Sequence, residues 1–229
     1  MNASTAALDI EKARYNMVEQ QVRTWEVLDQ SVLDLLLVLR REDFVPPQYR
    51  ALAFMDLEIP LRIDGCDSGE AMFAPKVEAR FLQELTVKSH ERALEIGTGS
   101  GYMAALLAYK AQQVLTVEID ARLAAFGAAN LERAGVRNVK VEVGDAARGW
   151  AARAPYDVIM VSGSLPVLPE ALLAQLKVGG RLAAIVGDAP VMSAQIVTRV
   201  ADGAYETLRL FETCVKPLRN AWRPSAFRF

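Results

Sequence analysis

The chain has 229 residues, of which 52% are hydrophobic and 24% are charged, which is sufficient for one domain with a buried core, or one domain plus an extension. The formal net charge of −2 gives no overall reason to expect nucleic acid or an anionic membrane as a partner. Residues 35–39 form a compact apolar stretch that is too short to span a bilayer, and residues 1–25 lack the apolar segment of a secretory signal. We therefore expect a cytoplasmic protein without a membrane partner.

The first ninety residues differ in pattern from the rest of the chain. Helical periodicity covers residues 11–22 and 31–39, and irregular sequence follows around Pro46-Pro47 and at residues 64–69. We interpret residues 1–90 as a helical extension and a loop, which cover the edge of a domain formed by residues 91–229. The neighbouring arginines Arg40 and Arg41 are interpreted as solvated surface.

Few side chains indicate metal or acid–base chemistry. Cys66 and Cys214 are far apart in the sequence and neither belongs to a Cys-x-x-Cys pair. His90 is the only histidine and lies in a polar turn. The sequence therefore predicts no metal site, redox motif or catalytic triad.

The strongest functional signal is a glycine-rich turn after a short apolar strand, in residues 93–102. The strand runs directly into Gly97, Gly99 and Gly101, and a helical segment follows. Glycines at the end of a strand let the backbone turn sharply and approach a ligand, and the helix N-terminus points its free N–H groups at the same place. Tyr102 stands where a dinucleotide fold has its third glycine, and no Gly-Lys-Ser/Thr follows, so a nicotinamide cofactor and a phosphate loop are both disfavoured.

Two further strands end in acidic residues. Residues 113–120 present Glu118 about 20 residues past the glycines, where a carboxylate binds ribose hydroxyls. The strand at 139–143 ends in Gly144-Asp145-Ala146, and the carboxylate of Asp145 can accept a hydrogen bond from an adenine amino group. Because the ends of parallel strands meet at one edge of a sheet, all three segments are expected to contact one nucleoside.

Strand-like and helix-like segments alternate from residue 91 onward. We predict strands ending at 96 and spanning 113–120, 139–143, 157–161, 181–186, 195–200 and 205–212, with helices at about 102–109, 122–133 and 168–176. An Asp-Gly turn separates the last two strands. The predicted fold is α/β: a doubly wound, mostly parallel seven-stranded sheet that ends in an antiparallel hairpin and carries an N-terminal helical extension.

Together, the glycine turn and the two acidic strand ends resemble the S-adenosyl-L-methionine (SAM) site of Rossmann-like methyltransferases. The resemblance implies that Glu95 and the backbone of residues 97–99 face the methionine part of the cofactor, Glu118 the ribose, and Asp145 with Ala146 the adenine. The predicted cofactor-binding residues are Glu95, Gly97, Thr98, Gly99, Ser100, Gly101, Glu118, Ile119, Asp145 and Ala146.

A narrower resemblance runs along nearly the whole chain. It rests on Arg-Glu-Asp-Phe-Val-Pro at 41–46, on residues 53–56 and 59–61, on the glycine turn, and on residues 155–159 and 176–182. These segments resemble protein-L-isoaspartate O-methyltransferases. The resemblance implies a repair enzyme that methylates the free α-carboxylate of an L-isoaspartyl residue in a damaged protein or peptide, leaving an ester that collapses to a succinimide.

One loop departs from the family. The family sequence is close to Gly-Gln-Thr-Ile-Ser-Gln-Pro, whose serine is regarded as the active-site residue, whereas residues 69–75 read Gly-Glu-Ala-Met-Phe-Ala-Pro. Phe73 stands at the serine position and Ala71 at the threonine position, so no catalytic residue is assigned. Glu70 adds a negative charge where a carboxylate substrate approaches. The predicted substrate pocket consists of Glu70, Met72, Phe73, Pro75 and Ser162.

Other functions stay open at this point. A more apolar pocket suits a methyltransferase acting on a small aromatic or quinone-like acceptor, and a non-catalytic SAM-binding module, as a homodimer, is a further alternative. Ser162 and Ser164 are able to contact such an acceptor or to cap the helix that follows, and capping is favoured. A nicotinamide oxidoreductase is disfavoured by Tyr102 and by the lack of a Tyr-x-x-x-Lys pair.

Overall fold

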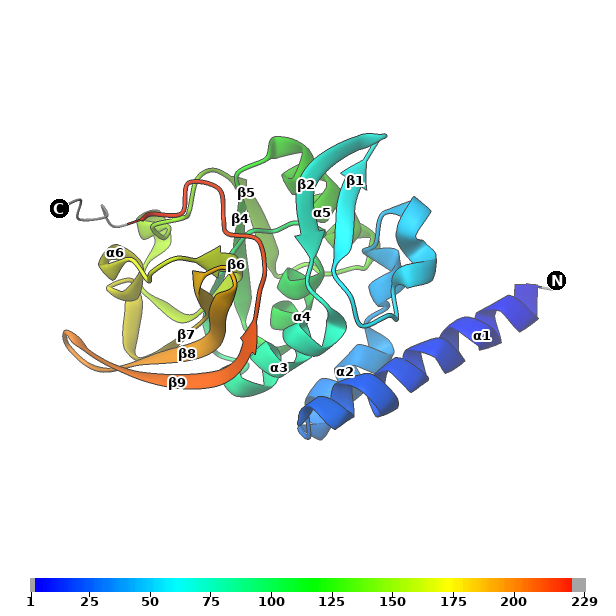
Figure 1. Ribbon diagram of the computed structural model, residues 1–229, viewed down its shortest axis with the longest axis horizontal. Coiled ribbons are helices and arrows are strands. Elements are labelled where there is room, and N and C mark those ends of the chain that lie inside the picture. The colour runs from blue at the N-terminus through cyan, green and yellow to red at the C-terminus, as the bar shows by residue number, and fades with distance from the viewer. Residues whose placement is uncertain (1–2, 224–229) are drawn as a thin grey trace.

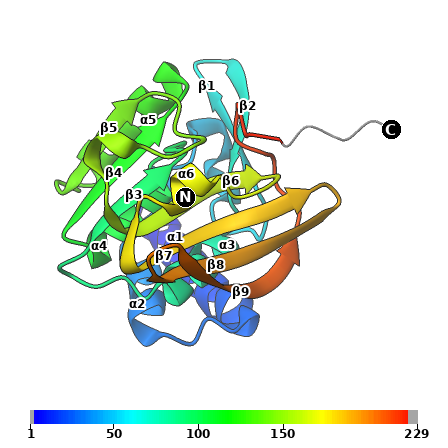
Figure 2. The same ribbon diagram turned by 90° about the vertical axis from the view of Figure 1, so that its left-hand side faces the viewer.

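The computed structural model describes residues 3–223 and contains the predicted seven-stranded sheet (Figures 1 and 2). The strands are β3 (Arg92–Ile96), β4 (Gln113–Glu118), β5 (Val139–Val143), β6 (Tyr156–Leu165), β7 (Leu176–Asp188), β8 (Val191–Ala201) and β9 (Ala204–Thr213). They are arranged in the order β5-β4-β3-β6-β7-β8-β9. The first five strands of this order pair in parallel, whereas β8 and β9 are antiparallel. The α/β fold and its closing hairpin are therefore confirmed.

The helices also follow the prediction in most places. They are α1 (Ala3–Asn16), α2 (Gln30–Val38), α3 (Pro75–Leu85), α4 (Tyr102–Lys110), α5 (Ala121–Arg133) and α6 (Glu170–Leu173). A π-helical turn, Met17–Val22, continues α1, and short 3-10 turns occupy Arg23–Trp25, Arg41–Asp43, Pro47–Leu52 and Ala151–Arg153. The start of α1 extends away from the body of the protein (Figure 1).

The alternation of side chains along the strands builds two apolar layers, one on each face of the sheet. In β3, Ala93 belongs to one core cluster, while Leu94 and Ile96 belong to the other. The first cluster joins the sheet to α2, α3, α4 and α5, and the second joins it to α6 and the loop around Trp150. Residues on both sides of residue 90 belong to the first cluster. The division of the chain at residue 90 stays a prediction.

Three local predictions in the chain are wrong. The predicted helix at 168–176 is only α6, because Leu176 already pairs with Tyr156 of β6 and so begins β7. β7 continues through Gly179, whose φ of +81° accommodates an irregularity in the pairing, so this strand begins before the predicted residue 181. Residues 64–69, predicted as irregular, form the tip of an antiparallel hairpin of β1 (Ile59–Ile63) and β2 (Cys66–Met72).

The interpretation of Arg41 as surface is also wrong. Its side chain is fully buried and pairs with the buried carboxylate of Glu78 in α3. The adjacent Glu42 pairs with Arg14 of α1, and Phe44 packs edge-on against Tyr102 with ring centroids 5.3 Å apart. The Arg-Glu-Asp-Phe segment thus ties the N-terminal helices to α3 and α4, because a buried charge requires a buried partner.

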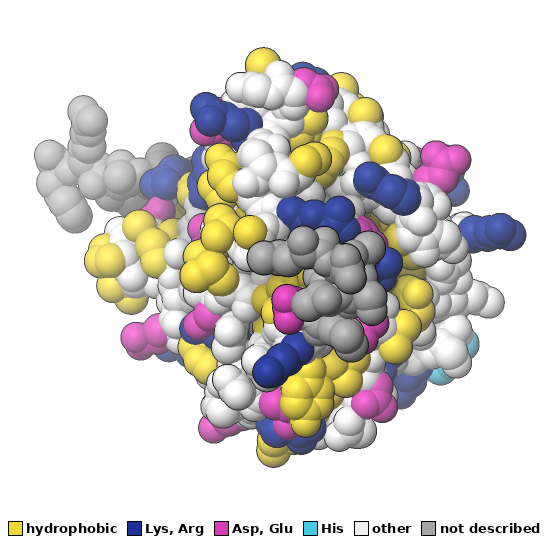
Figure 3. All heavy atoms as spheres, turned by 90° about the vertical axis from the view of Figure 1, so that its right-hand side faces the viewer, with side chains coloured by type: hydrophobic (Ala, Val, Ile, Leu, Met, Phe, Trp, Pro, Cys, Tyr) yellow, Lys and Arg dark blue, Asp and Glu magenta, His cyan; other side chains and the backbone are white. Residues whose placement is uncertain are grey.

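The surface mixes charges of both signs. On the face from which the start of α1 projects, acidic and basic side chains are intermixed with hydrophobic ones (Figure 3). Between residues 3 and 223, no helix combines the length and the hydrophobicity that crossing a membrane requires.

Candidate functional site

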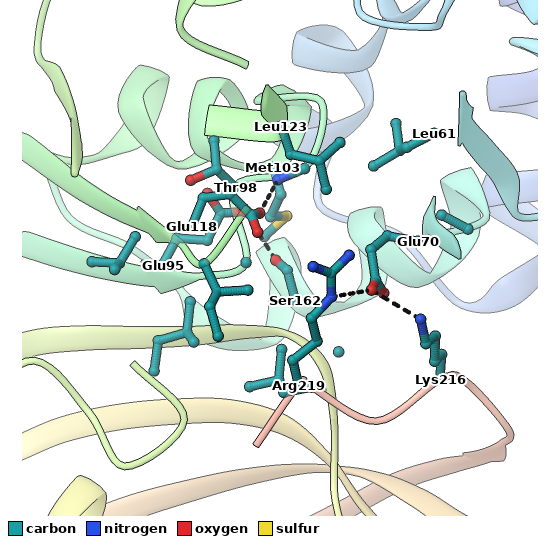
Figure 4. Close-up of a pocket in the computed structure, with 18 of the residues that line it drawn as sticks. Leu61, Glu70, Glu95, Thr98, Met103, Glu118, Leu123, Ser162, Lys216 and Arg219 are labelled. Atoms are coloured by element: carbon teal, nitrogen blue, oxygen red, sulfur yellow. Dashed lines mark hydrogen bonds and ion pairs between the residues drawn. The ribbon is translucent and has the colours of Figure 1, made fainter. Parts of the chain in front are cut away.

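A large pocket lies where the strand order reverses between β3 and β6, at the carboxyl ends of the parallel strands (Figure 4). The pocket contains about 960 Å³ of space, counted out to its solvent-open mouth. In open α/β sheets this edge is the usual place for ligands. The strand ends form one side, and the β1–β2 hairpin with the segment after β9 forms the other.

The glycine turn forms the floor of the pocket. Gly97 and Gly99 have φ values of +95° and +50°, and a Cβ on Gly97 would lie 3.0 Å from the carbonyl oxygen of Ser162. Both positions therefore require glycine, and their backbone faces the cavity without a side chain in between. Gly101 is outside the pocket lining and packs instead against Gly127 of α5, so its role is to bring α4 close to α5.

Glu95 is a fully buried carboxylate at the end of β3. It accepts hydrogen bonds from the hydroxyls of Thr116, at 2.7 Å, and Ser162, at 2.9 Å, and Thr116 is linked in turn to Thr98. Burial raises the pKa of Glu95 to about 8, and the nearby charge of Glu118 adds to this, although the two hydrogen bonds oppose it. A positively charged ligand group beside Glu95 would favour its ionised form.

Glu118 ends β4 and is held by the backbone. One oxygen accepts a hydrogen bond from the N–H of Gly99 at 2.9 Å, and the other accepts one from the N–H of Asp120 at 3.1 Å. Each carboxylate oxygen retains a second lone pair, so Glu118 can also accept hydrogen bonds from a diol.

Asp145 follows β5 and is held from two sides. Its Oδ1 accepts a hydrogen bond from the N–H of Ala147 at 3.0 Å, and its Oδ2 accepts one from the side-chain amide of Asn220 at 2.9 Å. Asp145, Ala146 and Ile119 all line the pocket. The C-terminal segment therefore contributes to the wall of the pocket at Asp145, a contact that the sequence analysis did not predict.

The opposite end of the pocket is formed by the loop that departs from the family. Met72 and Phe73 are buried there beside Leu61, and Glu70 stands at the rim. Pro75, predicted as part of the substrate pocket, is outside the lining, because it is buried as the first residue of α3.

A buried ion pair fixes the position of this loop. The guanidinium of Arg41 pairs with Glu78, donates a hydrogen bond to the carbonyl of Phe73 at 2.6 Å, and donates another to the carbonyl of Ala53 at 3.1 Å. Its plane also lies over the ring of Tyr102, 5.0 Å from the centroid. Burial raises the pKa of Glu78, and the charge of Arg41 opposes that shift. Arg41 and Glu78 therefore hold the backbone of this loop in place at Phe73.

The prediction that Ser162 and Ser164 cap a helix is wrong. Ser162 donates its hydroxyl to Glu95, as described above, and lines the pocket. Ser164 is fully buried and donates its hydroxyl to the carbonyl of Val215 at 3.0 Å. β6 runs to Leu165, so both serines belong to the strand.

The sequence analysis assigned no role at the site to four residues: Arg41, Glu78, Lys216 and Arg219. The first two form the buried pair below the loop, and the other two line the pocket from the C-terminal segment. The helical spacing of 75–85 placed Glu78 on the buried face of α3 and was the one available indication for it.

The residues present suit an adenosyl cofactor. A glycine backbone that faces the cavity without side chains, a carboxylate able to hold a diol, and a buried carboxylate for a cationic group lie in one pocket. Within residues 3–223, no cluster of three or more histidine, cysteine, aspartate or glutamate side chains is arranged to hold a metal. The fold and the pocket define the class of the chain as the SAM-dependent methyltransferases.

Comparison with known proteins narrows the class to a family. The family model described as Protein-L-isoaspartate(D-aspartate) O-methyltransferase matches residues 12–220. The chain belongs to this family, whose methyl donor is S-adenosyl-L-methionine.

Individual relatives agree along most of their length. The protein-L-isoaspartate O-methyltransferase of Methanoculleus marisnigri is 38% identical over 208 residues, covering 90% of this chain and 91% of that protein. The enzyme of the same name from Koribacter versatilis is 36% identical over 205 residues, covering 90% of each chain. A solved structure titled protein-L-isoaspartate O-methyltransferase superimposes with a TM-score of 0.78 at 26% identity, covering 90% of this chain and 65% of that one.

Proposed function

We propose that the protein transfers the methyl group of SAM to the α-carboxylate of L-isoaspartyl residues in damaged proteins or peptides. In this proposal, Glu95 and residues 97–99 bind the methionine part of the cofactor. Glu118 binds the ribose hydroxyls, and Asp145 with Ala146 binds the adenine. Family membership supports the reaction, and the geometry of the pocket supports the assignment of residues.

One observation carries the assignment: three acidic side chains from the ends of β3, β4 and the loop after β5 line a single pocket with the glycine turn. Glu118 is connected to this turn by its hydrogen bond from Gly99. A nucleoside bound there has acceptors available for its hydroxyls and its amino group. The buried Glu95 supplies the negative charge that a cationic amino acid moiety requires.

The reaction places few demands on acid–base groups. SAM supplies a methyl group on a positively charged sulfur, and the acceptor oxygen forms the new O–CH3 bond as the S–CH3 bond breaks and its electron pair stays on sulfur. A carboxylate is already ionised at neutral pH, so no base is required. The buried side chains of Leu61, Met72 and Phe73 exclude water from the end of the pocket where the acceptor binds in this proposal. The hydrogen bond from Arg41 to the carbonyl of Phe73 holds this loop in position.

The experiment measures methyl transfer from radiolabelled SAM to an isoaspartyl peptide and to its normal aspartyl twin. We expect selective labelling of the isoaspartyl peptide, and loss of most of this labelling in Glu118→Ala at a limiting SAM concentration. Glu132→Ala, which changes an exposed glutamate of α5, serves as the matched control and should label like the unmodified protein.

Labelling of both peptides, or of neither, contradicts the proposed acceptor. Equal labelling by Glu118→Ala and the unmodified protein contradicts the assigned ribose contact instead. Calorimetric titration with S-adenosylhomocysteine separates these outcomes, because it reports cofactor binding without an acceptor.

A further inference from the structure

Acidic side chains outnumber basic ones in the lining of the pocket. The acidic side chains in its lining are Glu58, Glu70, Glu78, Glu95, Glu118 and Asp145. Among the described residues, the cations in the lining are only Lys216 and Arg219, both from the segment after β9. Lys216 and Arg219 are therefore the lining side chains that can attract an acceptor with its own carboxylate.

Both cations converge on one atom. The Nζ of Lys216 lies 2.9 Å and the Nε of Arg219 lies 2.8 Å from the same oxygen, Oε1 of Glu70 (Figure 4). Two charge-assisted donors around one carboxylate oxygen form a carboxylate-binding site. In this structure the site holds a carboxylate of the protein itself.

The backbone under the two cations is firmly anchored. The N–H of Ser164 donates to the carbonyl of Lys216 at 3.1 Å, and the N–H of Leu218 donates back to the carbonyl of Ser164 at 2.9 Å. Arg219 also donates to the carbonyl of Ser68 at 3.0 Å. The side chains of Lys216 and Arg219 nevertheless keep 53% and 37% of their surface exposed, so a ligand can reach them.

We propose that Lys216 and Arg219 bind the α-carboxylate of the methyl acceptor, and that Glu70 is an internal competitor which the acceptor displaces. The inference rests on the proposed function in one respect, namely that the acceptor is a carboxylate. Exchanging one carboxylate for another keeps both cations paired, so displacement avoids leaving a charge without a partner. While the pair holds one oxygen, the second oxygen of the acceptor is free to take the methyl group.

Steady-state kinetics on the isoaspartyl peptide tests the pair. The double variant Lys216→Met/Arg219→Met should raise KM about 10-fold or more, as expected for the loss of hydrogen bonds to a charged group, with a smaller effect on kcat. Glu70→Gln should lower KM about threefold, because the competitor loses its charge. The control is Arg223→Met, an arginine in the same segment that pairs with Asp188 and is outside the pocket lining.

A binding experiment keeps the test independent of turnover. The protein saturated with S-adenosylhomocysteine is titrated with the isoaspartyl peptide and with its analogue carrying an α-carboxamide. The unmodified protein should prefer the carboxylate about 10-fold, and the double variant should lose this preference. Titration of each variant with S-adenosylhomocysteine confirms that it is folded.

The outcomes separate the two proposals. Methylation of the isoaspartyl peptide with an unchanged KM in the double variant overturns this inference and leaves the proposed function intact. A carboxylate preference that depends on the pair, without methylation, supports the inference and overturns the proposed function. Equal binding of the two peptides, or binding of neither, overturns the inference.

Discussion

The two ends of the pocket are built in different ways. At the cofactor end, Glu95 and Glu118 are buried at the ends of neighbouring strands, and hydroxyls and backbone N–H groups hold them. At the acceptor end, Glu70 meets Lys216 across 146 sequence positions and Arg219 across 149, in partly exposed ion pairs. The first end depends on the sheet itself, and the second on two segments that pack over it. Substitutions at the acceptor end can therefore change the substrate without removing the cofactor site.

The largest expected effect concerns the buried pair under the acceptor loop. Arg41→Met leaves Glu78 and two carbonyls without their partner, so the free energy of unfolding should fall by about 3–5 kcal/mol. Urea denaturation measures this change. The control Arg50→Met removes an exposed pair with Asp43 and should cost less than about 1 kcal/mol.

A loss below about 1 kcal/mol in Arg41→Met would show that the loop does not depend on this pair. The double variant Arg41→Met/Glu78→Met tests the cause. Because it removes the stranded carboxylate, it should recover part of the lost stability.

The next effect concerns the cofactor end. Glu118→Ala should weaken binding of S-adenosylhomocysteine about 100-fold, because two hydroxyls lose a charged acceptor. The same change also removes the hydrogen bond that holds Gly99. Calorimetry measures the dissociation constant, with Glu132→Ala as the control. An unchanged constant would place the ribose elsewhere in the pocket.

Two glycines outside the pocket lining, Gly101 and Gly65, allow a direct comparison of packing. A Cβ on Gly101 would lie 2.9 Å from the carbonyl oxygen of Gly127, whereas a Cβ on Gly65, at the tip of the hairpin, meets open space. Both residues have positive φ, so alanine strains the backbone at either position. Gly101→Ala should therefore destabilise the protein by about 1–2 kcal/mol more than Gly65→Ala in thermal unfolding. Equal losses would mean that the close approach of α4 to α5 relaxes without cost.

The smallest effect is a pH dependence at the cofactor end. Because the pKa of Glu95 is about 8 without ligand, most Glu95 side chains are protonated at pH 7. Glu95 must therefore release a proton when a cationic cofactor binds beside it. Affinity for SAM should rise about fivefold between pH 7 and pH 8 and then level off. Glu95→Gln should remove this slope, and a flat profile in the unmodified protein would contradict the proposed contact.

The raised pKa of Glu95 has the opposite effect on stability: affinity for SAM rises with pH, whereas the free energy of unfolding falls. The pKa of Glu95 in the folded protein lies above its ordinary value of 4.5, so between these two values the folded state binds more protons than the unfolded state. The stability of the ligand-free protein should therefore fall as the pH rises from about 4.5 to about 8. Urea titrations across this range check the sign.

Local patterns predicted the sheet well and its connections less well. Short continuous apolar runs located the central strands, because a strand that is buried on both faces carries apolar side chains on each face. The predicted helix at 168–176 failed because pairing of Leu176 with β6 overrode the local helical pattern. The hairpin of β1 and β2 was missed because β1 is interrupted by Pro60 and β2 is largely exposed and lacks an apolar pattern.

By itself, the sequence determined the fold class, the family and the cofactor loop, because each can be recognised from short continuous segments of the chain. The spacing of Gly97, Gly99 and Glu118 is of this kind. Only the tertiary structure decided which charges meet at the acceptor end. The contacts of Glu70 with Lys216 and of Arg41 with Glu78 depend on the path of the chain in space, and no local pattern records that path.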